Sequence, residues 1–238
     1  MKNNFIAVLD SGIGGISTLI ELKKSLPNQS YIYFSDNSNA PYGQKSNREI
    51  FSGLIGGLTQ IREYSPKFVV LACNTLSVNL RERIEDFLCV KTFGIFPPVE
   101  SHLLGGEKTL LIATPRTIEN FRNIKGLDKV GLPYLAGEIE RYKFRLNSLN
   151  VKAHLKNILP CYDTIILGCT HYFFVENQII DHLKPLKIDS GNHFLLKQLL
   201  REIRFNKILN NTSKNQTIFI GENSIENKIF FDKVVKEL

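Results

Sequence analysis

Short, wholly apolar runs alternate along the chain with longer segments in which apolar residues recur at helical spacing. The runs predict strands at residues 5–9, 31–34, 68–71, 109–112, 164–167 and 218–220, and the longer segments predict helices at 16–25, 48–64 and 79–87. Helical patterns also follow the last three strands. Strands that alternate with helices are typical of a parallel α/β architecture. Since ligands of such sheets bind beyond the carboxyl ends of the strands, we expect functional side chains directly after the strands.

One sequence unit occurs twice. Residues 69–75 read VVLACNT and residues 165–171 read IILGCTH, and in both a wholly apolar strand leads to a small residue, a cysteine, polar groups and a helical pattern. A strand without polar positions is what a sheet covered on both faces requires. The breaker-rich stretch Phe96-Pro97-Pro98 lies between the two units and marks a domain boundary, and a second polar stretch spans residues 210–216. The repeat predicts two similar α/β domains that face each other.

The composition adds limits rather than a function. The hydrophobic fraction of 43% is ordinary for a soluble protein, no apolar run is long enough to span a bilayer, and the N-terminus lacks the features of a signal peptide. We therefore expect a cytoplasmic protein. The net charge of +7 is spread over the whole chain, which favours a solvated lysine-rich surface over a nucleic-acid-binding patch.

Two of the four cysteines stand where chemistry is expected. Cys73 and Cys169 each follow an apolar strand and precede a helical pattern, so a helix dipole is expected to lower the pKa of both thiols toward neutrality. Two opposed groups of this kind can remove a proton from one face of a carbon and deliver one to the other. The alternative is that both are small buried residues at strand ends. Cys89 and Cys161 lack this context and are interpreted as structural.

Polar residues next to the two thiols are candidates for substrate binding. Asn74, Thr75 and Thr170 are natural N-cap residues, and the same groups at a helix start can bind a carboxylate. His171 fits a neighbouring acid or base, or a hydrogen-bonded structural histidine, because Cys169 and His171 are too few ligands for zinc.

The turn after the first strand, DSGIGG at residues 10–15, is rich in glycine. A dinucleotide site is disfavoured, because Ser17 replaces the third glycine of that fingerprint and Asp10 would repel a diphosphate. Asp10 suits an ammonium group or a thiol partner. The alternative is a tight turn that needs glycine.

Six segments of the sequence resemble the aspartate/glutamate racemase superfamily, and the glutamate racemase family within it. They read LDSGIGG, SDNSNAPYG, LACNT, FGIFPP, LGCTHYFF and KIDSG, and they occur in the family's order over residues 9–191. The combination of DSGIGG with PYG is similar to members that act on glutamate rather than aspartate.

The resemblance implies roles for particular residues. Cys73 and Cys169 would be the two catalytic bases, assisted by Asp10 and His171, without pyridoxal phosphate and without a metal. Substrate-binding roles are implied for Asp10, Ser11, Tyr42, Gly43, Asn74, Thr75, Thr117 and Thr170. Ala113 stands where the family usually has a glycine in the stretch that contains Thr117. Whether Glu140, in the divergent segment LPYLAGEIE, is an acidic assisting residue stays open.

The resemblance also implies an organisation and a biological role. Two parallel-sheet α/β domains would face each other across an active-site cleft: residues 1–95 plus 208–238 on the Cys73 side, and residues 96–207 on the Cys169 side. The implied substrate is glutamate, the implied assembly a homodimer, and the implied role the supply of D-glutamate for bacterial peptidoglycan, and so for cell wall biogenesis and cell shape. No membrane partner is expected. Rival hypotheses are a racemase for aspartate or a related substrate, and a non-catalytic protein that binds nucleotides or nucleic acid.

Overall fold

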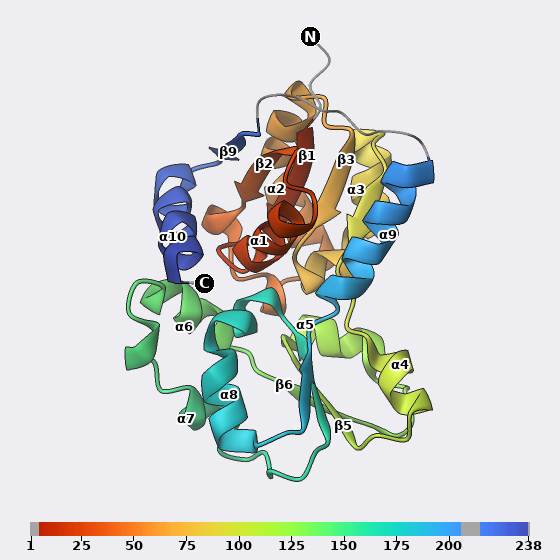
Figure 1. The fold of residues 1–238 in the computed structure, drawn as a ribbon, viewed down its shortest axis with the longest axis vertical. Helices are drawn as coiled ribbons and strands as arrows, with labels where there is room; N and C mark the ends of the chain where they lie inside the picture. The colour runs from red at the N-terminus through yellow and green to blue at the C-terminus, as the bar shows by residue number, and fades with distance from the viewer. Residues whose placement is uncertain (1–4, 206–214, 238) are drawn as a thin grey trace.

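Two parallel sheets form the framework of the protein in a computed structural model that describes residues 5–205 and 215–237 (Figure 1). The first sheet has the strand order β4-β3-β1-β2-β9 and the second the order β6-β5-β7-β8, and every pairing is parallel. The strands are β1 (Phe5–Asp10), β2 (Ser30–Ser35), β3 (Phe68–Leu71), β4 (Thr92–Gly94), β5 (Thr109–Ala113), β6 (Leu127–Gly131), β7 (Thr164–Gly168), β8 (Lys187–Asp189) and β9 (Thr217–Ile220). The predicted fold class, two parallel-sheet α/β domains, is confirmed.

The central strands are apolar because helices cover both faces of each sheet. All residues of β1, β3, β5 and β7 are buried. The register brings Leu9 of β1 beside Leu71 of β3, and Ala113 of β5 beside Gly168 of β7. The residues that follow these strands therefore meet at one edge of each sheet.

Helices of two groups surround the sheets (Figure 1). Those around the first sheet are α1 (Gly15–Ser25), α2 (Asn47–Glu63), α3 (Asn74–Leu88), α9 (Asn192–Phe205) and α10 (Ser224–Glu237). Those around the second are α4 (Val99–Leu104), α5 (Pro115–Ile118), α6 (Leu135–Tyr142), α7 (Val151–Leu155) and α8 (Glu176–Leu183). Five short 3-10 turns complete the described elements: η1 (Asn37–Asn39), η2 (Tyr42–Gln44), η3 (Glu119–Phe121), η4 (Leu146–Ser148) and η5 (Thr170–Val175). None of the helices in the described ranges is long and apolar enough to cross a membrane.

The structure departs from the predicted elements at several places. The strands β4, β6 and β8 were not predicted, because they are short or half-exposed and so lack a long apolar run. The helix predicted at residues 79–87 begins at Asn74, which makes Cys73 its N-cap residue. After Cys169 the chain forms the 3-10 turn η5, and the helix α8 begins only at Glu176. The two halves of the sequence repeat therefore end differently.

The C-terminal part of the chain returns to the first sheet. Strand β9 pairs with β2, and α9 contacts α1 and β4 although the sequence placed it with the second domain. Most of the polar stretch 210–216, and the predicted boundary at residues 207 and 208, lie outside the described residues.

Candidate active site

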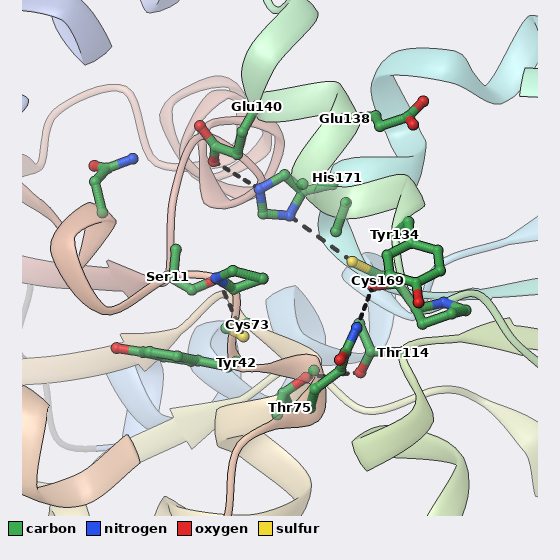
Figure 2. Close-up of a pocket in the computed structure, with 18 of the residues that line it drawn as sticks. Ser11, Tyr42, Cys73, Thr75, Thr114, Tyr134, Glu138, Glu140, Cys169 and His171 are labelled. Atoms are coloured by element: carbon green, nitrogen blue, oxygen red, sulfur yellow. Dashed lines mark hydrogen bonds and ion pairs between the residues drawn. The ribbon is translucent and has the colours of Figure 1, made fainter. Parts of the chain in front are cut away.

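A cavity of about 570 Å³ is lined by residues from around both sheets (Figure 2). Eight of the predicted site residues line it: Ser11, Tyr42, Gly43, Cys73, Asn74, Thr75, Cys169 and His171. Three others, Asp10, Thr117 and Thr170, are buried but do not line it. Of these, Asp10 accepts from the hydroxyl of the lining residue Ser11, Thr170 donates to Asp10, and the hydroxyl of Thr117 lies 3.2 Å from that of the lining residue Thr75.

The two thiols come from the ends of equivalent strands. Cys73 is the second residue after the end of β3, with Ala72 between them, and Cys169 follows β7 directly. Each is only 7% exposed, and both line the same cavity. Figure 2 shows them coming from the two sides of it. The structure thus brings together the cysteines that the sequence repeat singled out.

The neighbours of Cys73 include a hydroxyl, Ser11, and a buried carboxyl, Asp10. The Cys73 Sγ lies 3.9 Å from the Ser11 Oγ. Burial, and then the nearby Asp10 charge, raise the pKa of the Cys73 thiol well above its usual range, against a lowering hydrogen bond from the Leu76 backbone. The expectation of a lowered pKa is therefore wrong for Cys73, because desolvation outweighs the helix N-terminus.

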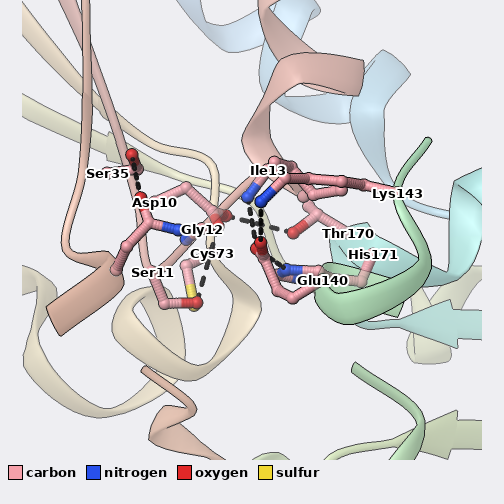
Figure 3. A network of polar contacts seen from close by, with 12 residues as sticks. Asp10, Ser11, Gly12, Ile13, Ser35, Cys73, Glu140, Lys143, Thr170 and His171 are labelled. Atoms are coloured by element: carbon pink, nitrogen blue, oxygen red, sulfur yellow. Dashed lines mark hydrogen bonds and ion pairs between the residues drawn. The ribbon is translucent and has the colours of Figure 1, made fainter. Parts of the chain in front are cut away.

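Asp10 is a fully buried carboxyl held from both domains. Its Oδ1 accepts a hydrogen bond from the Gly12 backbone N–H at 2.8 Å, and its Oδ2 accepts one from the Thr170 hydroxyl at 3.1 Å (Figure 3). Burial raises the pKa of Asp10, although His171 and these hydrogen bonds oppose the change. Asp10 is thus placed to act on its neighbours rather than to bind a ligand in the cavity.

A chain of titratable groups lies behind Cys169. The Cys169 Sγ is 3.8 Å from His171 Nδ1, and His171 Nε2 is 2.8 Å from Glu140 Oε1. Burial opposes a charge on His171, but hydrogen bonds to Cys169 and Glu140 and the charges of both raise its pKa well above the usual value. For Glu140, burial is likewise outweighed by the bond to His171, and its pKa is lowered. His171 is therefore a cation next to the second thiol, and Glu140 a carboxylate.

Glu140 also joins the two domains. It lies on α6, and its Oε1 accepts a hydrogen bond of 2.5 Å from the backbone N–H of Ile13, in the turn after β1 (Figure 3). The sequence left the role of Glu140 open, since nothing in its local pattern distinguishes it from the other acidic residues of α6. Only the fold reveals that it faces His171.

The glycine-rich turn exists to let the second domain approach. A Cβ on Gly12 would lie 1.7 Å from Glu140 Oε1, and one on Gly14 would lie 2.5 Å from His171 Nδ1. Neither glycine has a positive φ. A tight turn is therefore not the reason for glycine at these two positions. Glycine is needed because a side chain would collide with the second domain, not because the backbone conformation excludes other residues.

Hydroxyl groups cluster at one side of the cavity. The Thr75 hydroxyl lies 3.0 Å from that of Thr114 and 3.2 Å from that of Thr117. Thr114, which sequence reasoning missed, lines the cavity and caps α5 through a bond from the Thr117 N–H. Its position directly after a strand and before a proline is an N-cap signal that could have revealed it.

Two further lining residues define what a ligand meets. The Asn74 residue lines the cavity, and its Oδ1 atom is buried without a hydrogen bond from any described residue. The Tyr42 hydroxyl donates to Asp36 Oδ2 at 2.5 Å, so the ring and not the hydroxyl is free to face a ligand. Among the described residues no group of three or more His, Cys, Asp or Glu side chains is placed to hold a metal ion.

The protein has two parallel-sheet domains, and each contributes a cysteine at a strand end to one cavity. This combination defines its class as an amino-acid racemase of the aspartate/glutamate type. None of the protein-family models matches the chain. It is similar to the glutamate racemase of Campylobacter concisus (31% identical over 252 residues, 98% of this chain and 95% of that protein). It is also similar to the glutamate racemase of Clostridium acetobutylicum (32% over 245 residues, 96% and 95%). The chain belongs to the glutamate racemase family.

Solved structures agree with this assignment. Glutamate racemase from Thermus thermophilus, in complex with beta-chloro-D-alanine, superposes with a TM-score of 0.79 at 26% identity and covers 98% of this chain and 93% of its own. The isoform RacE1 from Bacillus anthracis gives a TM-score of 0.78 at 26% identity, with 100% and 94% covered.

Proposed function

We propose that this protein interconverts L- and D-glutamate, with Cys73 and Cys169 as two bases that act on opposite faces of the α-carbon. The observation that carries the proposal is that two buried thiols from different domains line one cavity. Family membership supports glutamate as the substrate. We expect the reaction to need neither pyridoxal phosphate nor a metal.

In the proposed mechanism one thiolate removes the α-proton from one face of the α-carbon, and the opposite thiol donates a different proton to the other face. Starting from L-glutamate, the Cys169 thiolate takes the α-proton, and the Cys73 thiol delivers its own proton to the opposite face to give D-glutamate. The reverse reaction exchanges the two roles. Each turnover leaves one thiol and one thiolate, with their positions exchanged.

The electrostatics support a resting state that is ready for L-glutamate. The raised pKa of Cys73 keeps this group a neutral thiol, able to donate. The His171 cation lies 3.8 Å from the Cys169 sulfur and favours negative charge there. One thiol is thus set to donate and the other to accept.

The substrate needs anchors for its carboxylates and its ammonium group. The hydroxyls of Thr75 and Thr114 and the backbone N–H groups at the start of α3 are donors for a carboxylate, and they also stabilise the enolate charge that develops on deprotonation. The Asn74 Oδ1 accepts from the ammonium group. Tyr42 and Gly43, for which binding roles were predicted, line the same cavity. Asp10, Thr117 and Thr170 support the site from behind.

The biological role that we infer is the supply of D-glutamate for bacterial peptidoglycan, by a homodimer in the cytoplasm. Membership of the glutamate racemase family supports this role. A racemase for aspartate is distinguished by chiral analysis of both amino acids after incubation in heavy water.

The decisive experiment separates the two thiols. Cys73→Ser and Cys169→Ser should each lower racemisation by about 10³-fold or more, because a hydroxyl is a far weaker acid and inversion needs both groups. Loss of HCl from 3-chloroglutamate, read as release of 2-oxoglutarate and ammonia, needs only one base. Cys169→Ser should then spare the D-enantiomer of this analogue and Cys73→Ser the L-enantiomer.

The exposed cysteines supply matched controls. Cys89→Ser and Cys161→Ser change the same atoms away from the cavity and should leave racemisation unchanged. The two-thiol mechanism is wrong if both active-site variants lose the same enantiomer, or if either still racemises glutamate at nearly the wild-type rate.

A further inference from the structure

Lys143 is a buried cation at the far end of the chain of groups behind Cys169. It is 9% exposed and lines the cavity. Its Nζ lies 4.0 Å from Glu140 Oε2 and 3.2 Å from Glu226 Oε2. Figure 3 shows the ammonium group next to the Glu140 carboxylate, on the side away from His171. A buried ammonium group persists only when it is paired, so these two carboxylates define where Lys143 can lie.

Charges of alternating sign connect Lys143 to the thiol. Lys143 faces the Glu140 carboxylate, Glu140 holds His171 Nε2 at 2.8 Å, and His171 Nδ1 faces the Cys169 sulfur at 3.8 Å. The Lys143 charge is one of the causes that keep the pKa of Glu140 low. A carboxylate that stays ionised and in place fixes the orientation and the charge of His171.

The contacts on this chain come from both domains. Glu226 lies on α10, which follows β9 of the first sheet, and it reaches Lys143 just beyond α6. On the other side of Glu140, the backbone N–H of Ile13 reaches the same carboxylate from the turn after β1. The surroundings of Cys169 are therefore completed by the first domain.

We propose that Lys143 is a positioning residue for racemisation, which holds Glu140 against His171 behind Cys169, and that Glu226 anchors it from the C-terminal helix of the first domain. Docking of α10 against the second domain thereby becomes part of the preparation of the Cys169 base. The assignment of Cys169 as a base rests on the proposed function, but the contacts among these three charged residues do not.

The proposal predicts how Glu140 titrates, and several groups face that carboxyl. They are the cations His171 and Lys143, the Ile13 backbone N–H, the Asp10 carboxyl, the Tyr33 hydroxyl and, through Lys143, the Glu226 carboxylate. Lys143→Met keeps an unbranched side chain that is one heavy atom shorter, and it removes the ammonium group with its positive charge. Since an opposite charge favours the ionised form, its loss should raise the pKa of Glu140.

The first measurement needs no substrate. The side-chain carboxyl of Glu140 is followed by ¹³C NMR titration in the full chain, and its signal is assigned by its loss in Glu140→Gln. Its midpoint should move to higher pH in Lys143→Met and stay near the wild-type value in Lys143→Arg. An unmoved midpoint in Lys143→Met overturns the proposal.

The second measurement uses the enantiomers of 3-chloroglutamate. Lys143→Met should slow HCl loss from the L-enantiomer about tenfold in kcat, with KM nearly unchanged, and should leave the D-enantiomer within about twofold of wild type. The acid limb of the L-side pH profile should move to higher pH, and Lys143→Arg should restore most of the rate. Equal slowing of both enantiomers with an unmoved profile assigns Lys143 a packing role only and overturns the proposal.

Two variants on α10 test the anchor. Glu226→Gln removes the closer partner of the ammonium group and should slow only the L-side elimination, by about threefold. Glu237→Gln is the matched control, because it makes the same change on the same helix at an exposed residue that pairs with Lys233 at 3.8 Å and does not touch the charged chain. It should leave both rates unchanged. A wild-type rate in Glu226→Gln overturns the anchor, and this arm decides the matter if Lys143→Met fails to fold.

Failure of the proposed function has a different signature. It appears as the same enantiomer preference in Cys73→Ser and Cys169→Ser. The Glu140 titration is read in the free protein and is not affected by that outcome.

Discussion

The two thiols of the cavity have surroundings of opposite character. Next to Cys73 lie the Ser11 hydroxyl and the buried Asp10, both on the strand-to-turn segment that neighbours β3 in the same sheet. Next to Cys169 lies the His171 cation, whose partner Glu140 comes from another helix and is reached by the first domain. The first thiol is thus served locally and the second across the cleft.

This difference teaches that two thiols at equivalent strand ends can have unlike electrostatic surroundings. Burial and the neighbouring Asp10 raise the pKa of the Cys73 thiol, whereas the neighbour of the Cys169 sulfur is the His171 ring, whose own pKa is raised. Under the proposed mechanism, one must donate while the other accepts.

Apart from replacement of the thiols themselves, the largest expected effect comes from removing the side chain that lies next to each thiol. Asp10→Asn and His171→Asn should each lower kcat and kcat/KM together by about 10²-fold, because these side chains act on the thiols and do not hold the substrate. With 3-chloroglutamate, Asp10→Asn should slow HCl loss mainly from the D-enantiomer and His171→Asn mainly from the L-enantiomer. Steady-state kinetics with both enantiomers measures this.

The exposed His193 gives a matched control, since His193→Asn makes the same change outside the cavity and should alter neither rate. A rise in KM with kcat unchanged in either active-site variant would show that the residue binds substrate instead.

The next prediction tests whether the first domain must approach His171 closely for the second thiol to be prepared. Gly14 has α-helical dihedral angles, so alanine fits its backbone, but the added Cβ would lie 2.5 Å from His171 Nδ1 and 2.6 Å from Thr170 Oγ1. Gly14→Ala should displace His171 and destabilise the protein by about 1–3 kcal/mol. Urea unfolding and L-side elimination kinetics measure the two consequences.

Gly56 on α2 provides the comparison, because a Cβ there would meet nothing within 4 Å. Gly56→Ala should keep full activity and stabilise the protein by up to about 1 kcal/mol through helix propensity. If both variants behave alike, close approach to His171 is not the reason for glycine at position 14.

The fold and the two thiols could be predicted from the sequence for a definite physical reason. A doubly covered strand must be apolar throughout, so β3 and β7 stand out and point to Cys73 and Cys169 at their ends. The resemblance motifs added the turn at residues 10–15. These signals are local along the chain, and local signals survive in a single sequence.

What could not be predicted depends on contacts between distant segments. Glu140 and Lys143 are ordinary polar residues on or near α6, and only tertiary packing brings them to His171 and Glu226. The raised pKa of Cys73 likewise follows from burial that the helix-dipole argument did not include. Thr114 is the exception, because its position before Pro115 is a readable capping signal.

The last expected effect is the pH dependence of the pair behind Cys169. In the folded protein the pKa of His171 is raised above 6.5, so its contribution to stability is complete below that pH and is lost as pH rises through the folded value. The pKa of Glu140 is lowered below 4.5, so its contribution is complete above that pH and is lost as pH falls through the folded value. Both contributions are therefore complete between 4.5 and 6.5.

A double-mutant cycle of Glu140→Gln and His171→Asn, followed by urea unfolding across pH, isolates this coupling. The coupling free energy should reach about 1–3 kcal/mol between pH 4.5 and 6.5 and decline on both sides of that window. No such pair exists beside Cys73, so Asp10→Asn combined with Ser11→Ala should give a coupling without this maximum. A pH-independent coupling between Glu140 and His171 would mean that the two meet as neutral hydrogen-bonding groups. The charge beside Cys169 would then not distinguish the second thiol from the first.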